Sequence, residues 1–220
     1  MKNNDETIKK TIIDTLYWDS RVDASDVKVQ VDNREVILRG TVPNYASSEA
    51  ALFDAYRVSG VTKVDNQLLV KYPSEIETPL DGEIKTNIET QLALYDSIKD
   101  SDIQVSVKNG KIVLNGHVDA YWKKFKAEQI ISDLTGVTGI HNALTVVPTK
   151  AIVDDVIADD IVGAISRSSI VDVNAIDIQV KNGEATISGA VSNRVEYEAV
   201  LDAVSNTFGV KNIVNNIHIK

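Results

Sequence analysis

Three histidines, His117, His141 and His218, are the side chains of this sequence best suited to metal binding or to proton transfer near neutral pH. No two of them stand at the spacing of a metal-ligand pair, and the absence of cysteine excludes zinc-thiolate sites, disulfides and thiol nucleophiles. Each histidine could be a ligand or general base, or a solvent-facing strand residue. We expect the second, and we therefore predict no metal site and no cofactor.

Serines and carboxylates are frequent, but none of them stands in a catalytic motif. The sequence contains no nucleophile elbow, Walker loop, dinucleotide fingerprint or EF-hand loop. The acidic pairs Asp154-Asp155 and Asp159-Asp160 lie near the predicted start of a helix, where negative charge is favourable against the helix dipole. They could also hold a cation, but helix capping and solubility explain them more simply. We therefore predict that the protein is not an enzyme.

One short stretch combines aromatic rings with lysines against an acidic background. Such a stretch suits an anionic membrane surface, where the rings lie at the level of the headgroups and the ammonium groups meet phosphate. The alternative is an amphipathic helix whose lysines reach water while its rings cover the neighbouring core. The candidate membrane- or ligand-binding residues are Tyr121, Trp122, Lys123, Lys124 and Lys126.

The strongest pattern is a motif that occurs three times: a glycine, a Gly-Val pair 20 residues later, and an asparagine 6 residues beyond that second glycine. The copies are offset by 76 and 149 residues, which indicates tandem small domains. The asparagines could form a ligand-binding amide, but we expect them to fix a turn or bulge beside the last strand. The glycines are expected to be backbone devices: the first ends a strand at a bend or close approach, and the second ends a helix. The recurring positions are Gly40, Gly60, Asn66, Gly116, Gly136, Asn142, Gly189, Gly209 and Asn215.

Each copy has the residue pattern of the same five elements, two helices and three strands. Apolar residues four apart predict an amphipathic helix, strict alternation predicts a half-buried strand, and a turn centred on asparagine predicts a hairpin to a second strand. A second helix follows, capped near Asn44, Asp119 or Asn193, and a third strand closes the unit. In the first copy these runs are Ile8-Ile12-Leu16, Val27-Val29-Val31, Asp32-Asn33-Arg34, Val36-Ile37-Leu38 and Val64-Asn66-Leu68-Val70.

The sequence therefore predicts an α+β protein of three tandem small domains. Each domain is expected to be α-β-β-α-β, with two helices packed on one face of a three-stranded mixed sheet. The predicted domains span residues 1–72, 78–148 and 152–220. Short linkers join them, and the first linker contains Pro73 and Pro79, so we expect it to be extended and semi-rigid.

The repeated strings resemble BON domains over nearly the whole chain. They are LRGTV, LNGHV and ISGAV at the first glycine, and SGVTKVDNQLLV, TGVTGIHNALTV and FGVKNIVNNIHI at the second. BON domains occur in osmotically inducible periplasmic proteins of bacteria and in nodulation, secretin-related and mechanosensitive-channel proteins. The resemblance implies attachment to membranes or phospholipid, envelope maintenance and stress protection, and in one related protein potassium binding.

The charge of the chain bounds its partners and its location. A formal net charge of −9 disfavours long-range attraction to nucleic acid or to an anionic bilayer, although a local basic patch could still act against that background. No nucleic-acid partner is expected. No run approaches the length of a transmembrane helix, and the N-terminal residues lack the apolar segment of a signal peptide. The expected location is cytoplasmic as the sequence stands, or periplasmic if a leader has been removed.

Together these patterns predict a non-enzymatic binding or scaffold protein linked to envelope or osmotic-stress adaptation. Its partner would be a membrane, a phospholipid or an envelope protein, recognised by the surfaces of the repeated domains. The alternative is a potassium sensor that coordinates the ion with backbone carbonyls at turns and domain junctions, which would leave no signature in the sequence.

Overall fold

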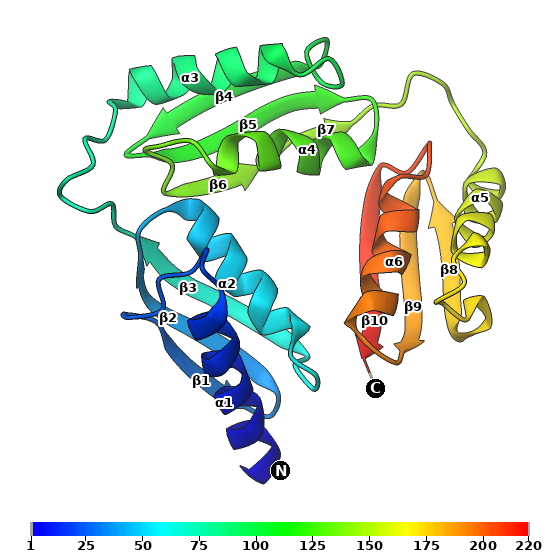
Figure 1. Ribbon diagram of the computed structural model, residues 1–220. Coiled ribbons are helices and arrows are strands. Elements are labelled where there is room, and N and C mark those ends of the chain that lie inside the picture. Colours follow the sequence, from blue (N-terminus) through cyan, green and yellow to red (C-terminus); the bar gives the residue numbers. More distant parts are fainter. Residues whose placement is uncertain (1, 220) are drawn as a thin grey trace. The chain divides into compact units, whose positions relative to one another are not determined.

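The computed structural model describes residues 2–219, with side chains from residue 4, and it contains the three predicted α-β-β-α-β units (Figure 1). The α+β class and the three-stranded mixed sheets with two helices are confirmed. The first domain comprises α1 (Lys2–Trp18), β1 (Lys28–Asp32), β2 (Glu35–Val42), α2 (Tyr45–Arg57) and β3 (Lys63–Val70). The second comprises α3 (Asp81–Leu94), β4 (Asp102–Lys108), β5 (Lys111–Val118), α4 (Tyr121–Ser132), β6 (Gly139–Asn142) and β7 (Thr145–Val146). The third comprises α5 (Asp154–Arg167), a 3-10 turn η1 (Val173–Ala175), β8 (Ile176–Lys181), β9 (Glu184–Val191), α6 (Arg194–Ser205) and β10 (Asn212–Ile219).

The middle strand of each sheet is the second strand of the domain. In the first domain, β2 pairs antiparallel with β1 and parallel with β3, in a register that runs from Glu35 opposite Lys63 to Val42 opposite Val70. The third domain repeats this arrangement with β8, β9 and β10. In the second domain the last strand is split, because β6 and β7 both lie beside β5 but are separated by two residues. A parallel neighbour requires a crossover connection, which the second helix of each domain supplies.

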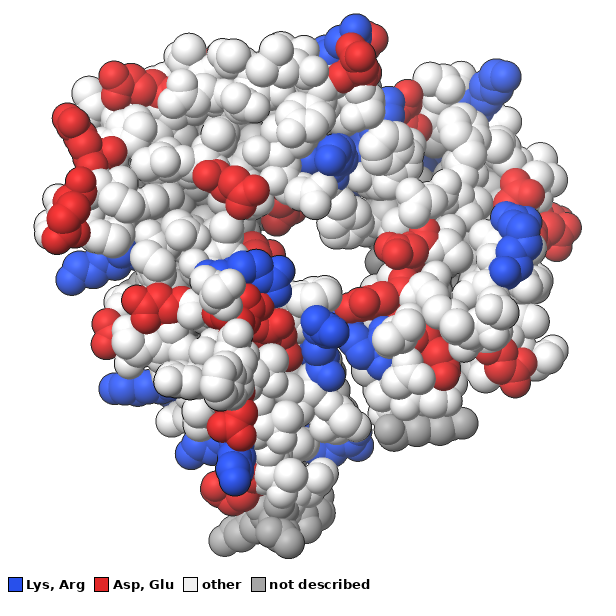
Figure 2. Space-filling model, in the orientation of Figure 1, with Lys and Arg blue, Asp and Glu red and all other residues white. Residues whose placement is uncertain are grey.

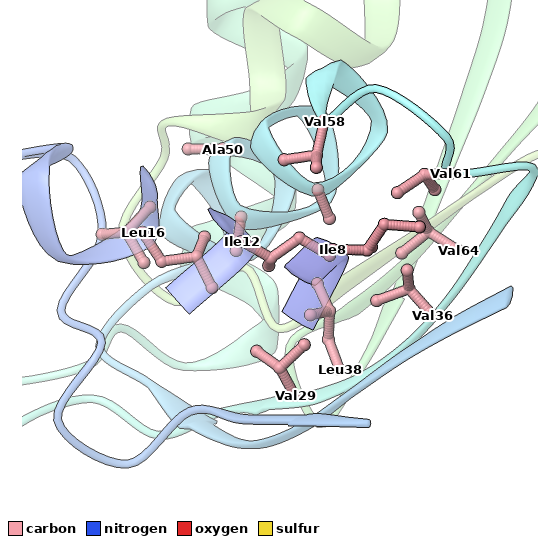
Figure 3. Close-up of a cluster of buried hydrophobic side chains, with 13 residues drawn as sticks. Ile8, Ile12, Leu16, Val29, Val36, Leu38, Ala50, Val58, Val61 and Val64 are labelled. Atoms are coloured by element: carbon pink, nitrogen blue, oxygen red, sulfur yellow. The ribbon is translucent and has the colours of Figure 1, made fainter. Parts of the chain in front are cut away.

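The apolar stripe of the first helix forms the centre of each core. Figure 3 shows Ile8, Ile12 and Leu16 among Val29, Leu38 and the side chains of α2, and all three of these α1 residues are at least 98% buried. The corresponding buried stripes are Ile84, Ile88 and Leu92 in α3, and Ile157, Ile161 and Ile165 in α5. The spacing of four predicted these faces correctly.

The hairpin between the first two strands turns through two residues with left-handed backbone conformation. The φ angles are 50° and 69° at Asn33 and Arg34, 52° and 71° at Asn109 and Gly110, and 55° and 81° at Asn182 and Gly183. Positive φ at both central residues is the geometry of the type I′ turn that matches the twist of adjacent strands. The predicted hairpins are therefore confirmed, although the first one places an arginine where the other two have glycine.

An aspartate in the first turn of each first helix binds the hairpin turn of its own domain. Its two carboxylate oxygens accept the two consecutive N–H groups of the turn residues. The N–O distances are 3.1 and 3.1 Å for Asp5, 2.7 and 2.9 Å for Asp81, and 2.7 and 2.9 Å for Asp154. We call this contact the carboxylate clamp; it fixes the helix start to the hairpin across 28 and 29 residues of sequence.

The recurring glycines allow two close approaches. At Gly116, with φ +109°, an added Cβ would overlap the backbone carbonyl oxygen of Asp102 at the start of β4. At Gly136, with φ +93°, an added Cβ would lie 2.6 Å from Cδ1 of Ile84 in the core stripe. The sequence-based boundaries were wrong in detail at both places. β5 continues to Val118 beyond Gly116, and α4 ends at Ser132, so Gly136 belongs to the turn that follows the helix.

Two of the three predicted caps of the second helix are present. Asn44 and Asn193 accept hydrogen bonds from the backbone N–H groups of Ser47 and Glu196, at 2.7 and 3.0 Å. The prediction of Asp119 as a cap was wrong, because α4 begins at Tyr121 and Asp119 instead forms an ion pair with Lys123. Asp119 lies two residues before the first residue of α4, and Lys123 in the first turn of the helix is its ionic partner.

We expect Gly116→Ala to destabilise the second domain by about 1–3 kcal/mol or more, because alanine meets both an unfavourable φ and a fixed carbonyl oxygen. Gly82→Ala is the matched control: Gly82 lies in α3, and an added Cβ would meet nothing within 4 Å. That variant should gain up to about 1 kcal/mol from helix propensity. Urea unfolding of the full chain measures both changes, and equal stability of the two variants would contradict the close approach.

We expect Asp154→Ala to destabilise the third domain by about 1–3 kcal/mol, because it leaves two turn N–H groups, one of them partly buried, without their acceptors. The amides of Asn182 and Gly183 should then exchange with solvent faster. Asp155→Ala is the control, since Asp155 shares the first turn of α5 and its helix-dipole interaction but does not belong to the clamp. Similar losses in both variants would show that only the dipole matters.

Candidate functional site

The predicted basic and aromatic stretch lies at the N-terminal end of helix α4. Lys123 pairs with Asp119 at 2.7 Å, its side chain is only 18% exposed, and its ammonium group lies 5.7 Å from the centre of the Trp122 ring. Lys124 lies 5.6 Å from the ring of Tyr121. The structure thus holds the first two lysines of the stretch against its own aromatic rings.

Lys124 and Lys126 have further contacts inside the second domain. Burial lowers the pKa of Lys124, and the nearby Glu128 opposes this. Lys126 donates a hydrogen bond to Oε1 of Gln129 at 3.2 Å and lies 5.3 Å from the ring of Tyr95. Partial burial raises the pKa of Tyr121.

Phe125, which the sequence analysis did not include among the candidate residues, is the most exposed ring of the stretch. Its side chain is 55% exposed, and it meets Tyr121 edge to face at 5.5 Å between ring centroids. The signal was its place between Lys124 and Lys126, but only the helix geometry shows that it faces solvent. An exposed ring beside three ammonium groups can enter an apolar boundary while the cations remain in the polar layer.

The recurring asparagines all tie the last strand to the second helix. The side-chain amide of each donates to a group 18 residues earlier: Asn66 to the backbone oxygen of Ser48, Asn142 to that of Lys124, and Asn215 to the hydroxyl of Tyr197. The side-chain oxygen of each accepts the N–H two residues later. These amides are therefore occupied by contacts inside their own domains.

The histidines lie exposed on strands β5, β6 and β10. Nδ1 of His117 is 3.4 Å from a carboxylate oxygen of Asp102. Within residues 2–219, the described imidazoles and carboxylates form no group of three that could hold a metal ion. Nor is any helix of that range both long and apolar enough to cross a bilayer.

A pocket in the first domain escaped the sequence analysis. It has a volume of about 650 Å³ and lies where the end of α1, the following loop and the end of α2 meet. Arg21 binds Asp19 through Nε, 3.0 Å from both carboxylate oxygens, and Nη2 of Arg21 lies 3.8 Å from Oδ1 of Asp54. Asp54 is only 3% exposed, and its Oδ2 accepts no hydrogen bond. The lining residues are Thr11, Asp14, Thr15, Trp18, Asp19, Ser20, Arg21, Asp54 and Arg57.

Comparison with known proteins decides the family of this chain. The family model of the BON domain matches residues 4–72, 80–148 and 153–220. The chain belongs to the BON domain family. The BON family is generally non-catalytic, and the motif strings at the recurring glycines lie inside the three matched segments.

Two bacterial proteins are similar to this BON chain over most of their own length. Osmotically-inducible protein Y of Escherichia coli (strain K12) is 27% identical over 144 residues, which cover 64% of this chain and 72% of that protein. Outer membrane lipoprotein DolP of Haemophilus influenzae is 28% identical over 136 residues, which cover 61% of this chain and 70% of that protein.

Similarity to solved structures is weaker. CdsD, a structural protein of the type III secretion system of Chlamydia trachomatis, aligns with 96% of this chain and 91% of its own at 16% identity, with a TM-score of 0.28.

The charged pair Arg21 and Asp54 occurs only in the first of the three aligned sequence copies. At the offsets of 76 and 149 residues, the position of Asp54 is occupied by Ile130 and Ala203, and that of Arg21 by Ser97 and Ile170. An apolar residue therefore suffices for the fold at the position of Asp54. The signal in the sequence was a pair of charged residues, Arg21 and Asp54, at positions where neither of the other two copies has a charged residue.

The pKa values of two carboxylates in this pocket, Asp19 and Asp54, are shifted in opposite directions. Hydrogen bonds from Arg21 hold the pKa of Asp19 well below its usual range. Burial, followed by the neighbouring Asp19 carboxylate, raises the pKa of Asp54 from 3.8 to about 6, although Arg21 and Arg57 oppose the change. Two neighbouring carboxylates repel each other when both are ionised, and here the more buried one keeps its proton to higher pH.

We expect Asp54→Asn to stabilise the first BON domain at pH 7.5 by roughly 1–2 kcal/mol, after allowance for solvent at the pocket mouth. Because the pKa of Asp54 in the folded protein exceeds its usual 3.8, the folded state binds the extra proton. The stability that this proton supplies is complete at low pH and is lost as pH rises through about 6. The advantage of the variant should therefore shrink toward pH 4.5 in urea unfolding.

The control for this measurement is Asp133→Asn, which removes an exposed carboxylate from the second BON domain. It should leave the pH profile of the first domain unchanged. A profile of Asp54→Asn parallel to that of the unmodified protein would show that Asp54 titrates normally.

Proposed function

We propose that this chain is a non-catalytic recognition protein of envelope or osmotic-stress adaptation, and that α4 of its second BON domain contacts an anionic phospholipid surface. The lysines at positions 123, 124 and 126 would meet lipid phosphates, and Phe125 would enter the apolar boundary. The observation that carries the proposal is the 55% exposure of Phe125 among these cations.

The common framework of the domains supports placing recognition on surfaces that differ between them. The repeated aspartates bind hairpin turns, the repeated asparagines join strand to helix, and the repeated glycines permit backbone contacts. Since these polar groups are satisfied inside each domain, none of them is available to a ligand without local rearrangement. The YWKKFK stretch has no counterpart in the other two copies, and it supplies groups of the kind a membrane surface requires.

The names of the relatives support the biological setting. One is described as osmotically inducible and the other as an outer membrane lipoprotein. We propose an envelope-related role for this chain on the basis of that kinship and of the lysine and aromatic content of α4.

Electrostatics set the expected strength of the contact. Each lysine near an anionic surface contributes about 1 kcal/mol, and salt screens that contribution. Acidic and basic side chains are interspersed over the face seen in Figure 2, and the net charge of −9 opposes approach to an anionic surface. Binding through α4 should therefore be weak and salt-sensitive, and it would be strengthened by simultaneous contacts at a surface.

The test is co-sedimentation of the full chain with anionic liposomes at low and high salt. The triple variant Lys123→Gln, Lys124→Gln, Lys126→Gln should lose most of the low-salt binding, and Phe125→Ser should lose part of it at either salt concentration. The matched control replaces three exposed lysines elsewhere, Lys10→Gln, Lys28→Gln and Lys108→Gln, with the same change in net charge. It should retain clearly more binding than the α4 triple variant.

The outcomes separate the α4 surface from general charge attraction. Equal losses in the two triple variants would mean that only net charge matters, and binding that survives both salt and the α4 substitutions would overturn the proposal. If no liposome binding occurs, calorimetric titration with potassium tests the alternative of an ion sensor.

A further inference from the structure

The pocket of the first BON domain has more negative than positive charge directed at its floor. Arg21 donates to Asp19 through both Nε and Nη2, and its Nη2 lies 3.8 Å from Oδ1 of Asp54. The guanidinium of Arg57 lies 5.4 Å from the ring of Phe53. Asp14 adds a further carboxylate to the lining. Two arginines thus face three carboxylates, and the most buried carboxylate has the weakest ion pair.

The excess of negative charge is most evident at Asp54. The side chain is 3% exposed and lines the pocket, and its Oδ2 has no hydrogen-bond donor in the structure. A buried carboxylate without a donor is costly, whereas Ile130 and Ala203 fill the same position in the other domains without that cost. A group that lowers stability where an apolar residue would serve is a sign of a binding function.

We propose that this pocket binds an organic ammonium group, with Asp54 and Asp14 as the anionic partners and the indole of Trp18 as the aromatic one. The ammonium group could belong to a free small molecule or to a lipid headgroup. This site is separate from the α4 surface and does not depend on it, since its residues belong to the first domain.

The indole distinguishes an organic cation from a metal ion. Trp18 lines the pocket, yet its side chain is 81% exposed, so its ring is available at the entrance. An alkylated ammonium gains from an aromatic face because it is weakly hydrated, and tryptophan is the most effective ring for this contact. Within residues 2–219, no described group of His, Asp and Glu side chains has the arrangement of a metal site. The pocket is widely open to solvent, so it can admit a headgroup on a surface as well as a free small molecule.

The proton is the natural competitor of this cation. Asp19 and Arg21 of the loop and Arg57 of α2 act on Asp54, and the exposed Asp14 of α1 belongs to the same pocket lining. A proton on Asp54 can be shared with Asp19, and this contributes to the pKa of about 6. A bound cation favours the ionised form, so binding should release a proton below pH 6 and become tighter as pH rises through 6.

The experiment is a titration of the full chain with tetramethylammonium and with choline at constant ionic strength, against potassium as the inorganic control. Fluorescence of Trp18 is followed in the background variant Trp122→Phe, which removes the other tryptophan of the chain. We expect a saturable change with both organic cations, and at least about tenfold weaker binding of potassium. Affinity should rise between pH 5 and 7.5, with proton release at the lower pH.

Two variants test the residues directly. Asp54→Asn keeps the shape of the side chain and should weaken binding by about tenfold or more and abolish its pH dependence. Trp18→Ala, followed by amide chemical shifts instead of fluorescence, changes an exposed side chain and should remove the preference for tetramethylammonium over potassium. The control Asp23→Asn, an exposed carboxylate of the same loop outside the pocket lining, should bind like the unmodified protein.

A vesicle arm distinguishes the two sources of the ammonium group. Binding to phosphatidylcholine vesicles that choline displaces would assign the site to a lipid headgroup, whereas choline binding without vesicle binding would assign it to a free molecule. The proposal is overturned if no organic cation saturates the site, if potassium binds equally well, or if Asp54→Asn binds unchanged. The α4 variants should have no effect on the choline titration, so failure of this proposal is distinguishable from failure of the α4 surface.

Discussion

Burial of one aliphatic stripe controls the structure of every domain. Ile8, Ile12 and Leu16, with their equivalents in the other two domains, become inaccessible only if a sheet and a second helix close over them. Full burial of each such side chain contributes roughly 1.5–3 kcal/mol, and a unit of this size has little other apolar surface to bury. The glycine turn before the third strand must therefore press against the first isoleucine of the stripe, where a side chain would collide with it.

Closing so small a core brings many backbone groups close together, and the repeated polar residues satisfy them. The carboxylate clamp accepts two N–H groups of a hairpin turn whose backbone is left-handed at both central residues. The strand asparagine accepts one backbone N–H and donates to the second helix. In each case a residue that could have been a ligand-binding group is engaged by its own domain, because buried backbone groups require partners.

Because the repeated polar residues are engaged by the fold, recognition is left to residues that differ between the copies. The first two BON domains carry different surfaces of this kind. The second exposes a phenylalanine among lysines whose charges are partly compensated by Asp119 and Glu128. The first places Asp54 beneath a surface lined by Asp19, Arg21 and Trp18. Because the framework is held by other residues, either surface can change with little effect on the core of its domain.

The sequence by itself determined the elements and their count. The spacing of four in the helices, the alternation in the strands, the asparagine-centred turns and the offsets of 76 and 149 residues are local or periodic, so they can be read without coordinates. Helix ends were placed less well at Gly60, Gly136 and Gly209, because a left-handed glycine can lie in the turn beyond a helix as well as at its last residue.

Only the tertiary structure decided the strand register and which residues from distant parts of the chain meet. It placed the third strand beside the second in parallel, it joined Asp5 to Arg34 and Asn66 to Ser48, and it brought Asp54 to Asp19 and Arg21 from another helix. The clamp aspartates recur at the same two offsets, yet their role could not be inferred from that recurrence, because a carboxylate at a helix start is already explained by the dipole. Residues so far apart in the chain meet only after the hydrophobic stripe is covered, and their chemistry depends on burial and distance that no local pattern records.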